Sequence, residues 1–126
     1  MHAPITALYA GLLALLYLLL AFRVVAVRRS AAIGLGDGGN ALLFTRIRIH
    51  GNAAEYIPLA LLLMLLLEIN GTSTGWLHGL GVALLIGRVA HVQGLSQSEG
   101  ASAGRLVGNV LTWGVILAAA VRNLVG

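Results

Sequence analysis

RIRIHGNAAEYIP, residues 46–58, opens an apolar run that continues to Leu67. If this segment is one helix, Arg48, Asn52 and Glu55 stand at positions i, i+4 and i+7 and share one face. Ionisable groups within a membrane helix are costly, so they normally face a partner or a hydrated cavity. The stretch therefore predicts a membrane helix whose polar face lines a cavity that the rest of the chain completes.

The composition of the whole chain is that of a membrane protein. Of 126 residues, 59% are hydrophobic and only 10% are charged, whereas soluble domains are about one quarter charged. The net charge of +4 comes from arginines that stand beside apolar runs, which indicates membrane topology rather than nucleic-acid binding. Cysteine is absent, so disulfides and thiolate metal sites are excluded.

Four apolar segments are long enough to cross a bilayer. They predict an all-α fold, an integral membrane four-helix bundle in a single domain spanning residues 1–126. The spans are expected at about 4–27, 42–68, 76–94 and 105–124. Small residues predict a close helix contact along the third span, through Gly75, Gly79, Ala83 and Gly87. Glu68 and Glu99 are expected at solvated helix ends.

The arginines predict the orientation. With four spans, Arg122 stands alone on one side of the membrane and the other seven arginines lie toward the opposite side. The positive-inside rule then puts both termini outside the cytoplasm, in what we expect to be a bacterial inner membrane. The polar candidates all fall at the cytoplasmic ends of the second, third and fourth spans: Arg48, Asn52, Glu55, Arg88, His91 and Arg105.

These residue types suit a small zwitterionic ligand. Arginine forks bind carboxylates, and a glutamate accepts hydrogen bonds from an ammonium group. We expect a peptide or an amino-acid-like anion, with an apolar co-substrate that arrives through the lipid. The structural alternative is that Arg48 and Glu55 form an intramembrane ion pair that holds helices together. His50, His78 and His91 fall on different helices, so no metal site is expected.

The pattern Arg48-x-x-x-Asn52-x-x-Glu55-Tyr-Ile-Pro58 closely resembles the second-helix signature of the membrane-associated proteins in eicosanoid and glutathione metabolism, the MAPEG family. GRVAHVQG, residues 87–94, resembles the end of that family's third helix, and the resemblance covers essentially the whole chain. In type the chain is similar to bacterial members that resemble microsomal glutathione transferases. The resemblance implies a four-helix protomer, a homotrimer, and glutathione bound as co-substrate between protomers near the cytoplasmic face.

Carried over residue by residue, the resemblance implies a glutathione site formed by Arg29, Arg48, Asn52, Glu55, Arg88 and His91. Arg105 falls where several relatives have the arginine that stabilises the glutathione thiolate, which makes it the catalytic candidate. A nearby guanidinium favours a thiolate and lowers the pKa of the thiol. The implied function is a membrane glutathione transferase or peroxidase that acts on lipophilic electrophiles or hydroperoxides dissolved in the bilayer.

Two positions depart from the family pattern. Gly51 stands where some eicosanoid-forming relatives have another arginine, and Leu95 where several have a tyrosine that contacts the thiol. Both differences argue against a specialised eicosanoid synthase. They keep open a second interpretation, a non-catalytic membrane protein of the same fold that binds a lipid or a protein partner. The residues also leave open whether glutathione or another small thiol is used.

Overall fold

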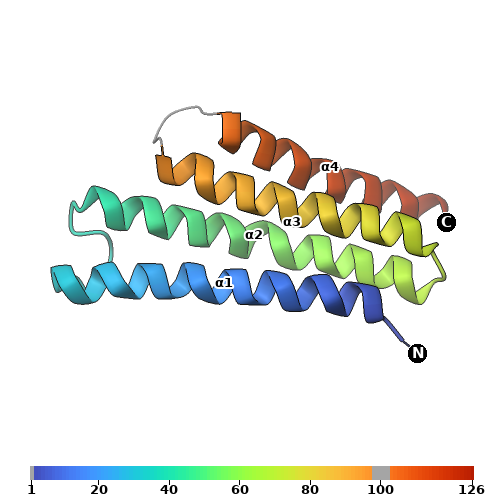
Figure 1. Ribbon diagram of the computed structural model, residues 1–126, viewed down its shortest axis with the longest axis horizontal. Coiled ribbons are helices and arrows are strands. Elements are labelled where there is room, and N and C mark those ends of the chain that lie inside the picture. The colour runs from blue at the N-terminus through green and yellow to red at the C-terminus, as the bar shows by residue number, and fades with distance from the viewer. Residues whose placement is uncertain (1, 98–102) are drawn as a thin grey trace.

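The computed structural model describes residues 2–97 and 103–126. Four helices make up most of this part of the chain: α1 (Pro4–Ala31), α2 (Ala41–Ile69), α3 (Thr74–Gln97) and α4 (Ala103–Val125). They run alternately up and down, and both termini lie at the same end of the bundle (Figure 1). Each helix is long and apolar enough to cross a bilayer. The predicted all-α, integral membrane four-helix architecture is therefore confirmed.

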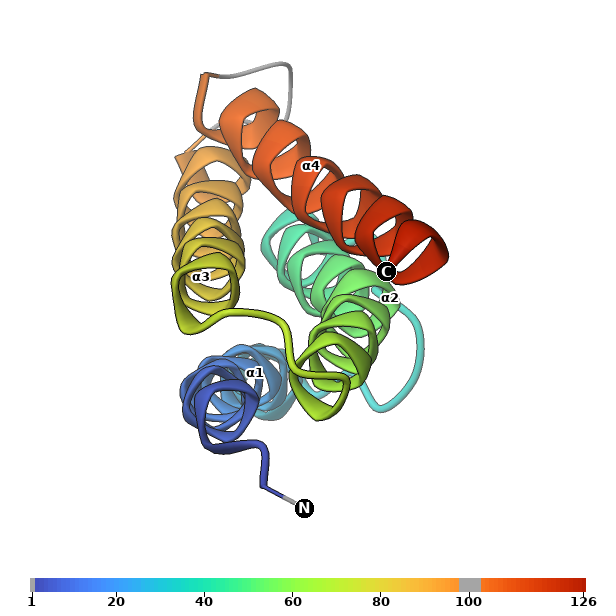
Figure 2. The ribbon, with the colours of Figure 1, turned by 90° about the vertical axis from the view of Figure 1, so that its right-hand side faces the viewer.

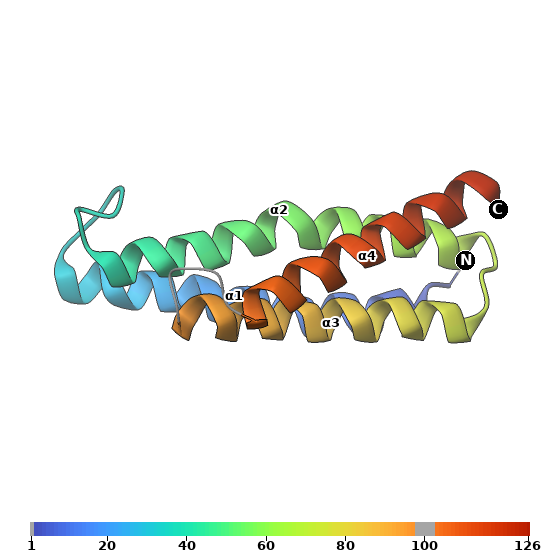
Figure 3. The same ribbon diagram turned by 90° about the horizontal axis from the view of Figure 1, so that it is seen from above.

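Viewed from one end, α1 and α4 lie on opposite sides of the bundle, with α2 and α3 between them (Figure 2). α4 begins beside the end of α3 and crosses diagonally toward α2 (Figure 3), where Asn123 Nδ2 donates to the Leu63 carbonyl over 3.2 Å. Away from the termini, α1 and α2 project beyond the ends of α3 and α4 (Figures 1 and 3). All four helices therefore pack together only over the length that α3 and α4 share with α1 and α2.

The helices extend further than the expected spans, and local contacts explain where they end. α1 continues to Ala31 and stops where Ala32 adopts a left-handed backbone conformation with φ 56°. Arg28 then donates through Nη1 to the carbonyls of Ile33 and Gly36, over 3.3 and 2.8 Å. α2 begins after Asn40, whose Oδ1 accepts from the backbone N–H of Leu43 over 2.9 Å, a normal N-cap.

Aliphatic side chains fill the space between the helices. Leu13, Met64, Leu84 and Ala119, one from each helix, are fully buried in a single apolar cluster. The outward faces are equally apolar, and several large side chains there are about two-thirds exposed: Leu15, Phe22, Leu106 and Leu117. Water-soluble monomers rarely expose contiguous apolar surface of this kind, so these faces contact lipid or other protein chains.

Glycines bring α3 and α4 into backbone contact. A Cβ atom added at Gly108 would lie 2.6 Å from the His91 Cβ and 2.7 Å from the Gly87 carbonyl oxygen. At Gly104 it would lie 3.0 Å from the Ala90 carbonyl oxygen and from the Gly94 Cα. The predicted small-residue contact of α3 is thus realised at Gly87. At Gly75 and Gly79 the prediction was wrong for this chain's own helices, because an added Cβ there would meet no atom within 4 Å.

At the end that carries the termini, Glu68 ties α2 to α1. Its two carboxylate oxygens accept from the backbone N–H groups of Ile5 and Thr6, over 3.0 and 2.7 Å. α1 has no side-chain cap of its own at Ala3, so a carboxylate from another helix satisfies its first free donors. Glu68 thus lies near the end of α2 and is partly exposed, as expected, but it also caps α1; Glu99 lies outside the described residues.

Candidate functional site

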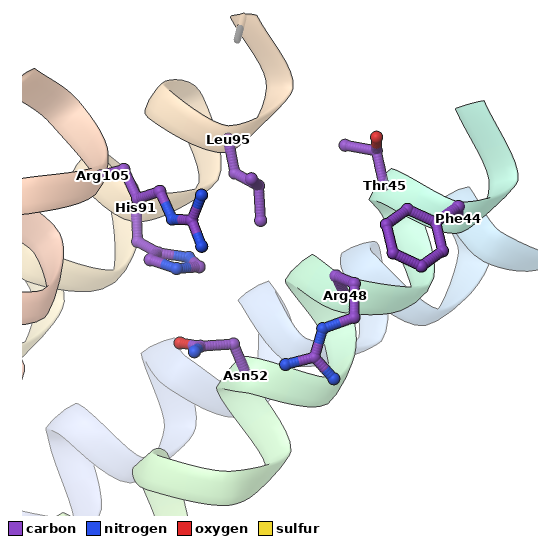
Figure 4. Close-up of a pocket in the computed structure, with 7 residues that line it drawn as sticks. All are labelled: Phe44, Thr45, Arg48, Asn52, His91, Leu95 and Arg105. Atoms are coloured by element: carbon purple, nitrogen blue, oxygen red, sulfur yellow. The ribbon is translucent and has the colours of Figure 1, made fainter. Parts of the chain in front are cut away.

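Side chains from α2, α3 and α4 surround a pocket of about 300 Å³ near the end of the bundle opposite the termini. Figure 4 shows its lining: Phe44, Thr45, Arg48, Asn52, His91, Leu95 and Arg105. Four of the seven predicted site residues are thus in one pocket: Arg48, Asn52, His91 and Arg105. They come from three helices, so the convergence depends on the bundle and not on spacing within one segment.

Arg88 lies beneath this pocket, with a side chain that is only 1% exposed. Its Nη2 donates to Asn52 Oδ1 over 2.7 Å and lies 3.4 Å from His91 Nδ1. Its Nη1 donates to Thr112 Oγ1 over 3.4 Å. One guanidinium therefore connects α2, α3 and α4 at the depth of the pocket floor, and it orients Asn52 and His91 from below.

The charge on Arg88 has no visible compensation. Among residues 2–97 and 103–126 it forms no ion pair with a carboxylate, and its Nε is buried without a hydrogen-bond partner. An unpaired buried charge costs several kcal/mol, on the order of the penalty for breaking a buried ion pair. Arg48 and Arg105 add two more guanidinium groups to the pocket wall. Three arginines, one of them buried, therefore stand in or directly beneath this pocket.

Arg48 and Glu55 lie on the outer side of α2. Arg48 Nη1 is 3.9 Å from Glu55 Oε1, and the two side chains are 50% and 56% exposed. Both residues belong to α2, so their ion pair does not hold two helices of the chain together, as the structural alternative had supposed. A half-exposed pair at this distance contributes little stability. Glu55 stands on α2 past Asn52, outside the set that lines the pocket.

Arg29 lies apart from the pocket. It is exposed on the last turn of α1, in the projecting α1–α2 hairpin, and it is not part of the lining. Sequence reasoning missed Phe44 and Thr45 as lining residues. Their signal was available, because they stand four and three residues before Arg48 and so share its helical face. Leu95, noted as a departure from the family pattern, does line the pocket.

A second hollow of about 380 Å³ lies between α1 and α2 and is almost entirely apolar. Tyr17 and Ala14 line it from α1, and Ala53, Ile57 and Pro58 from α2. It occupies a different face of α2 from Arg48. α2 continues as a helix through Pro58, which lines this apolar groove and cannot donate a backbone hydrogen bond to the Ala54 carbonyl.

Comparisons with known proteins identify the family of this chain and two relatives. The model of the MAPEG family matches residues 6–125. Inner membrane protein YecN of Escherichia coli (strain K12) is 42% identical over 120 residues, covering 95% of this chain and 90% of that protein. The protein of the same name from Escherichia coli O6:H1 matches to the same extent. No solved structure matches the chain.

Proposed function

The chain belongs to the MAPEG family, and from that premise we propose that it is a glutathione transferase or peroxidase acting on lipophilic substrates. It is an integral inner membrane protein with four apolar helices, and its Escherichia coli relatives are named inner membrane proteins. Their name records a location and no reaction, so the proposal rests on the chemistry of the pocket between α2, α3 and α4.

The observation that carries the proposal is the buried Arg88 beneath two further arginines. Glutathione has two carboxylates and one ammonium group, which is the charge pattern that this pocket needs. A carboxylate of the peptide would bind the fork of Arg48, with the buried charge of Arg88 beneath the pocket adding to the attraction, while the ammonium group would bind Glu55 at the outer edge. Asn52, already held by Arg88 through Oδ1, keeps its amide N–H group to donate to a peptide carbonyl.

Arg105 would act on the sulfur atom of bound glutathione. It stands at the start of α4 and lines the pocket beside His91 and Leu95, and its guanidinium would stabilise the thiolate of bound glutathione. The thiolate sulfur then forms a bond to an electrophilic carbon, and the leaving group departs with the bonding electrons. With a hydroperoxide, the sulfur takes the terminal oxygen and the alcohol leaves after protonation. Both substrates reach the site from the bilayer.

A second copy of the chain would complete the site. At 1.5 Å per residue, Glu55 lies about 20 Å along α2 from Glu68, which is well inside a hydrocarbon layer of about 30 Å. A charged side chain facing lipid there costs about 3 kcal/mol. Arg48 and Glu55 are nevertheless half exposed in one protomer. We propose a homotrimer in which a neighbouring protomer covers this face of α2, with both termini outside the cytoplasm.

The test is a thermal-shift and turnover series on detergent-solubilised trimer. Glutathione should raise the unfolding temperature, as any ligand of the native state does, and the thiolate absorbance should rise on binding. The Arg105→Ala variant should keep most of the stabilisation but lose turnover, whereas Arg122→Ala, at the opposite end, should keep both. Absence of stabilisation by glutathione or any other small thiol would refute the proposed site.

The second candidate is a MAPEG protein that binds a lipid or a protein partner without catalysis. Leu95 favours it, because an aliphatic side chain stands in the pocket wall and offers no hydroxyl to the thiol. This candidate predicts a stable trimer with no thiolate signal on adding glutathione. A Leu95→Tyr variant separates the two candidates. Higher turnover than in the parent would support the enzyme, because the added hydroxyl can help only if the site already holds a thiolate. No turnover would support the binding protein.

A further inference from the structure

A second group of arginines lies outside the pocket, where α1, α2 and α3 meet near the same end of the bundle. Arg46 Nη1 donates to the backbone carbonyl of Arg23 over 3.0 Å. Arg23 Nη2 donates to Ser96 Oγ over 3.2 Å. Arg23, Arg46 and Ser96, from α1, α2 and α3, are here called the phosphate cluster. None of the three lines the glutathione pocket proposed above.

Two like charges meet in this cluster, and no carboxylate among residues 2–97 and 103–126 bonds to either of them. Arg46 Nη1 reaches the Arg23 carbonyl over 3.0 Å, so the two positive charges lie on adjoining parts of α1 and α2, and Arg46 Nε is buried without a hydrogen-bond partner. The carboxylates of the described residues are engaged elsewhere. Asp37 accepts from the Gly39 N–H, Glu55 pairs with Arg48, and Glu68 caps α1 at the far end. None of these three carboxylates offsets the repulsion, which a bound anion would relieve.

The depth of the cluster identifies the kind of anion. Glu68 fixes Ile5 at the outer end of α1, and Arg23 lies about 27 Å further along the helix at 1.5 Å per residue. A hydrocarbon layer is about 30 Å thick, so Arg23 and Arg46 reach the boundary with the headgroups of the cytoplasmic leaflet. Phospholipid phosphates lie at that level, and arginine binds phosphate through its fork.

The surface below the cluster is suited to acyl chains. Leu19 and Leu12 precede Arg23 on α1 and therefore lie closer to the middle of the membrane. Their side chains are 55% and 41% exposed. On α3, Val89 lies about two turns before Ser96, also closer to the middle of the membrane, and is 42% exposed. Leu19 and Leu12 lie on the same side of α1 as Arg23 at helical spacing. Charged groups thus stand at headgroup level above apolar surface.

We propose that Arg23 and Arg46 bind the phosphate of one anionic phospholipid of the cytoplasmic leaflet, with Ser96 positioning the Arg23 fork. The lipid phosphate neutralises the two guanidinium groups and joins α1 to α2 and α3. This role is separate from topology, because a topology signal requires only that the charge remain on the cytoplasmic side. It is also independent of glutathione, since the two sites share no residue.

The test compares lipids and variants in the detergent-solubilised protein. Phosphatidylglycerol should raise the unfolding temperature of the parent more than phosphatidylcholine or inorganic phosphate does. In native mass spectra, Arg23→Gln and Arg46→Gln should each lower retained phosphatidylglycerol about fivefold, the ratio for losing one arginine contact near a membrane surface. Arg29→Gln removes one charge from an exposed position at the same end and should leave retention unchanged.

Several results would overturn the proposal. Equal losses in Arg29→Gln would mean that only total charge matters. Equal stabilisation by phosphatidylcholine would indicate general lipid packing. Equal stabilisation by inorganic phosphate would show that the cluster binds phosphate without requiring a lipid. If Arg46→Gln fails to fold, Arg23→Gln still decides, because among the described residues the Arg23 side chain donates only to the exposed hydroxyl of Ser96. Full retention of lipid by Arg23→Gln would refute the cluster.

Discussion

Replacing Gly108 with alanine tests the contact on which the whole pocket depends. The added Cβ would lie 2.6 Å from the His91 Cβ and 2.7 Å from both the Gly87 carbonyl oxygen and the His91 nitrogen. Carbon atoms pack favourably at about 3.5–4.0 Å, so α3 and α4 have to separate locally by about 1 Å. Two of the three opposing atoms belong to the backbone, so no side-chain rotation relieves the clash.

The magnitude follows from two opposing terms. Overpacking a tight contact costs about 1–3 kcal/mol, whereas exchanging glycine for alanine in a helix gains about 1 kcal/mol. Gly114→Ala on the same helix is the matched control, because an added Cβ there meets nothing within 4 Å. The difference between the two variants cancels the helix term and leaves about 1–3 kcal/mol. That corresponds to roughly 4–12 °C in unfolding temperature for a chain of this size.

The assay is thermal unfolding of both variants in one detergent at one scan rate, with and without glutathione. Gly108 stands one turn from both Arg105 and Thr112, so separating α3 from α4 also displaces Arg105 and the Arg88 contacts. Gly108→Ala should therefore lose stability and glutathione response together, while Gly114→Ala keeps both. If Gly108→Ala unfolds at or above the temperature of Gly114→Ala, the close α3–α4 contact is not present. His91 and Arg105 would then not be brought into one pocket by that contact.

Three further predictions address other parts of the molecule. Glu68→Ala should lower the free energy of unfolding by about 1–2 kcal/mol, as loss of a helix cap does. The control Asp37→Asn should not, because the amide oxygen of asparagine still accepts from the Gly39 N–H. Equal unfolding temperatures for the two variants would show that Glu68 is not a stabilising cap. Arg88→Met should keep the unfolding temperature within a few degrees, because apolar replacement of a buried charge is often tolerated, but should abolish stabilisation by glutathione; a retained glutathione shift would remove Arg88 from the site. Reporter fusions at either terminus should be active only if the reporter works outside the cytoplasm, and a cytoplasmic signal at both ends would reverse the orientation.

Much of the fold could be predicted because apolar length and charge placement are local properties. The four spans follow from runs of hydrophobic residues, and the structure extends them by one to four residues at most ends. The extensions depend on contacts between distant positions. α1 reaches Ala31 because the Arg28 fork binds carbonyls in the following loop, and its first turn is capped by Glu68, which stands 62 residues after Thr6. No window of sequence contains both partners of that cap.

The pocket could be predicted only in part. Arg48, Asn52, His91 and Arg105 were expected in one site, and the structure brings them together. Arg88 was expected beside them, but it lies beneath the pocket and holds Asn52 and His91 in place. That depth is set by Gly108, which lets α4 approach α3 closely enough for Thr112 to reach Arg88. A stripe of small residues predicts close packing, but it does not say which partner helix will be packed.

The cationic residues of this chain are all arginines, and topology alone does not account for that choice. The positive-inside rule counts lysine and arginine alike, whereas only arginine offers a planar fork of donors. Arg28 donates to two loop carbonyls through Nη1, and Arg88 donates through Nη1 to α4 and through Nη2 to α2. Arg46 reaches across to α1. Lysine at position 88 would keep the orientation but lose a pair of contacts that needs two directed donors. The prevalence of arginine thus reflects directed binding of oxygen atoms, and Arg→Lys variants separate this role from topology, since they change stability and ligand binding without inverting the protein.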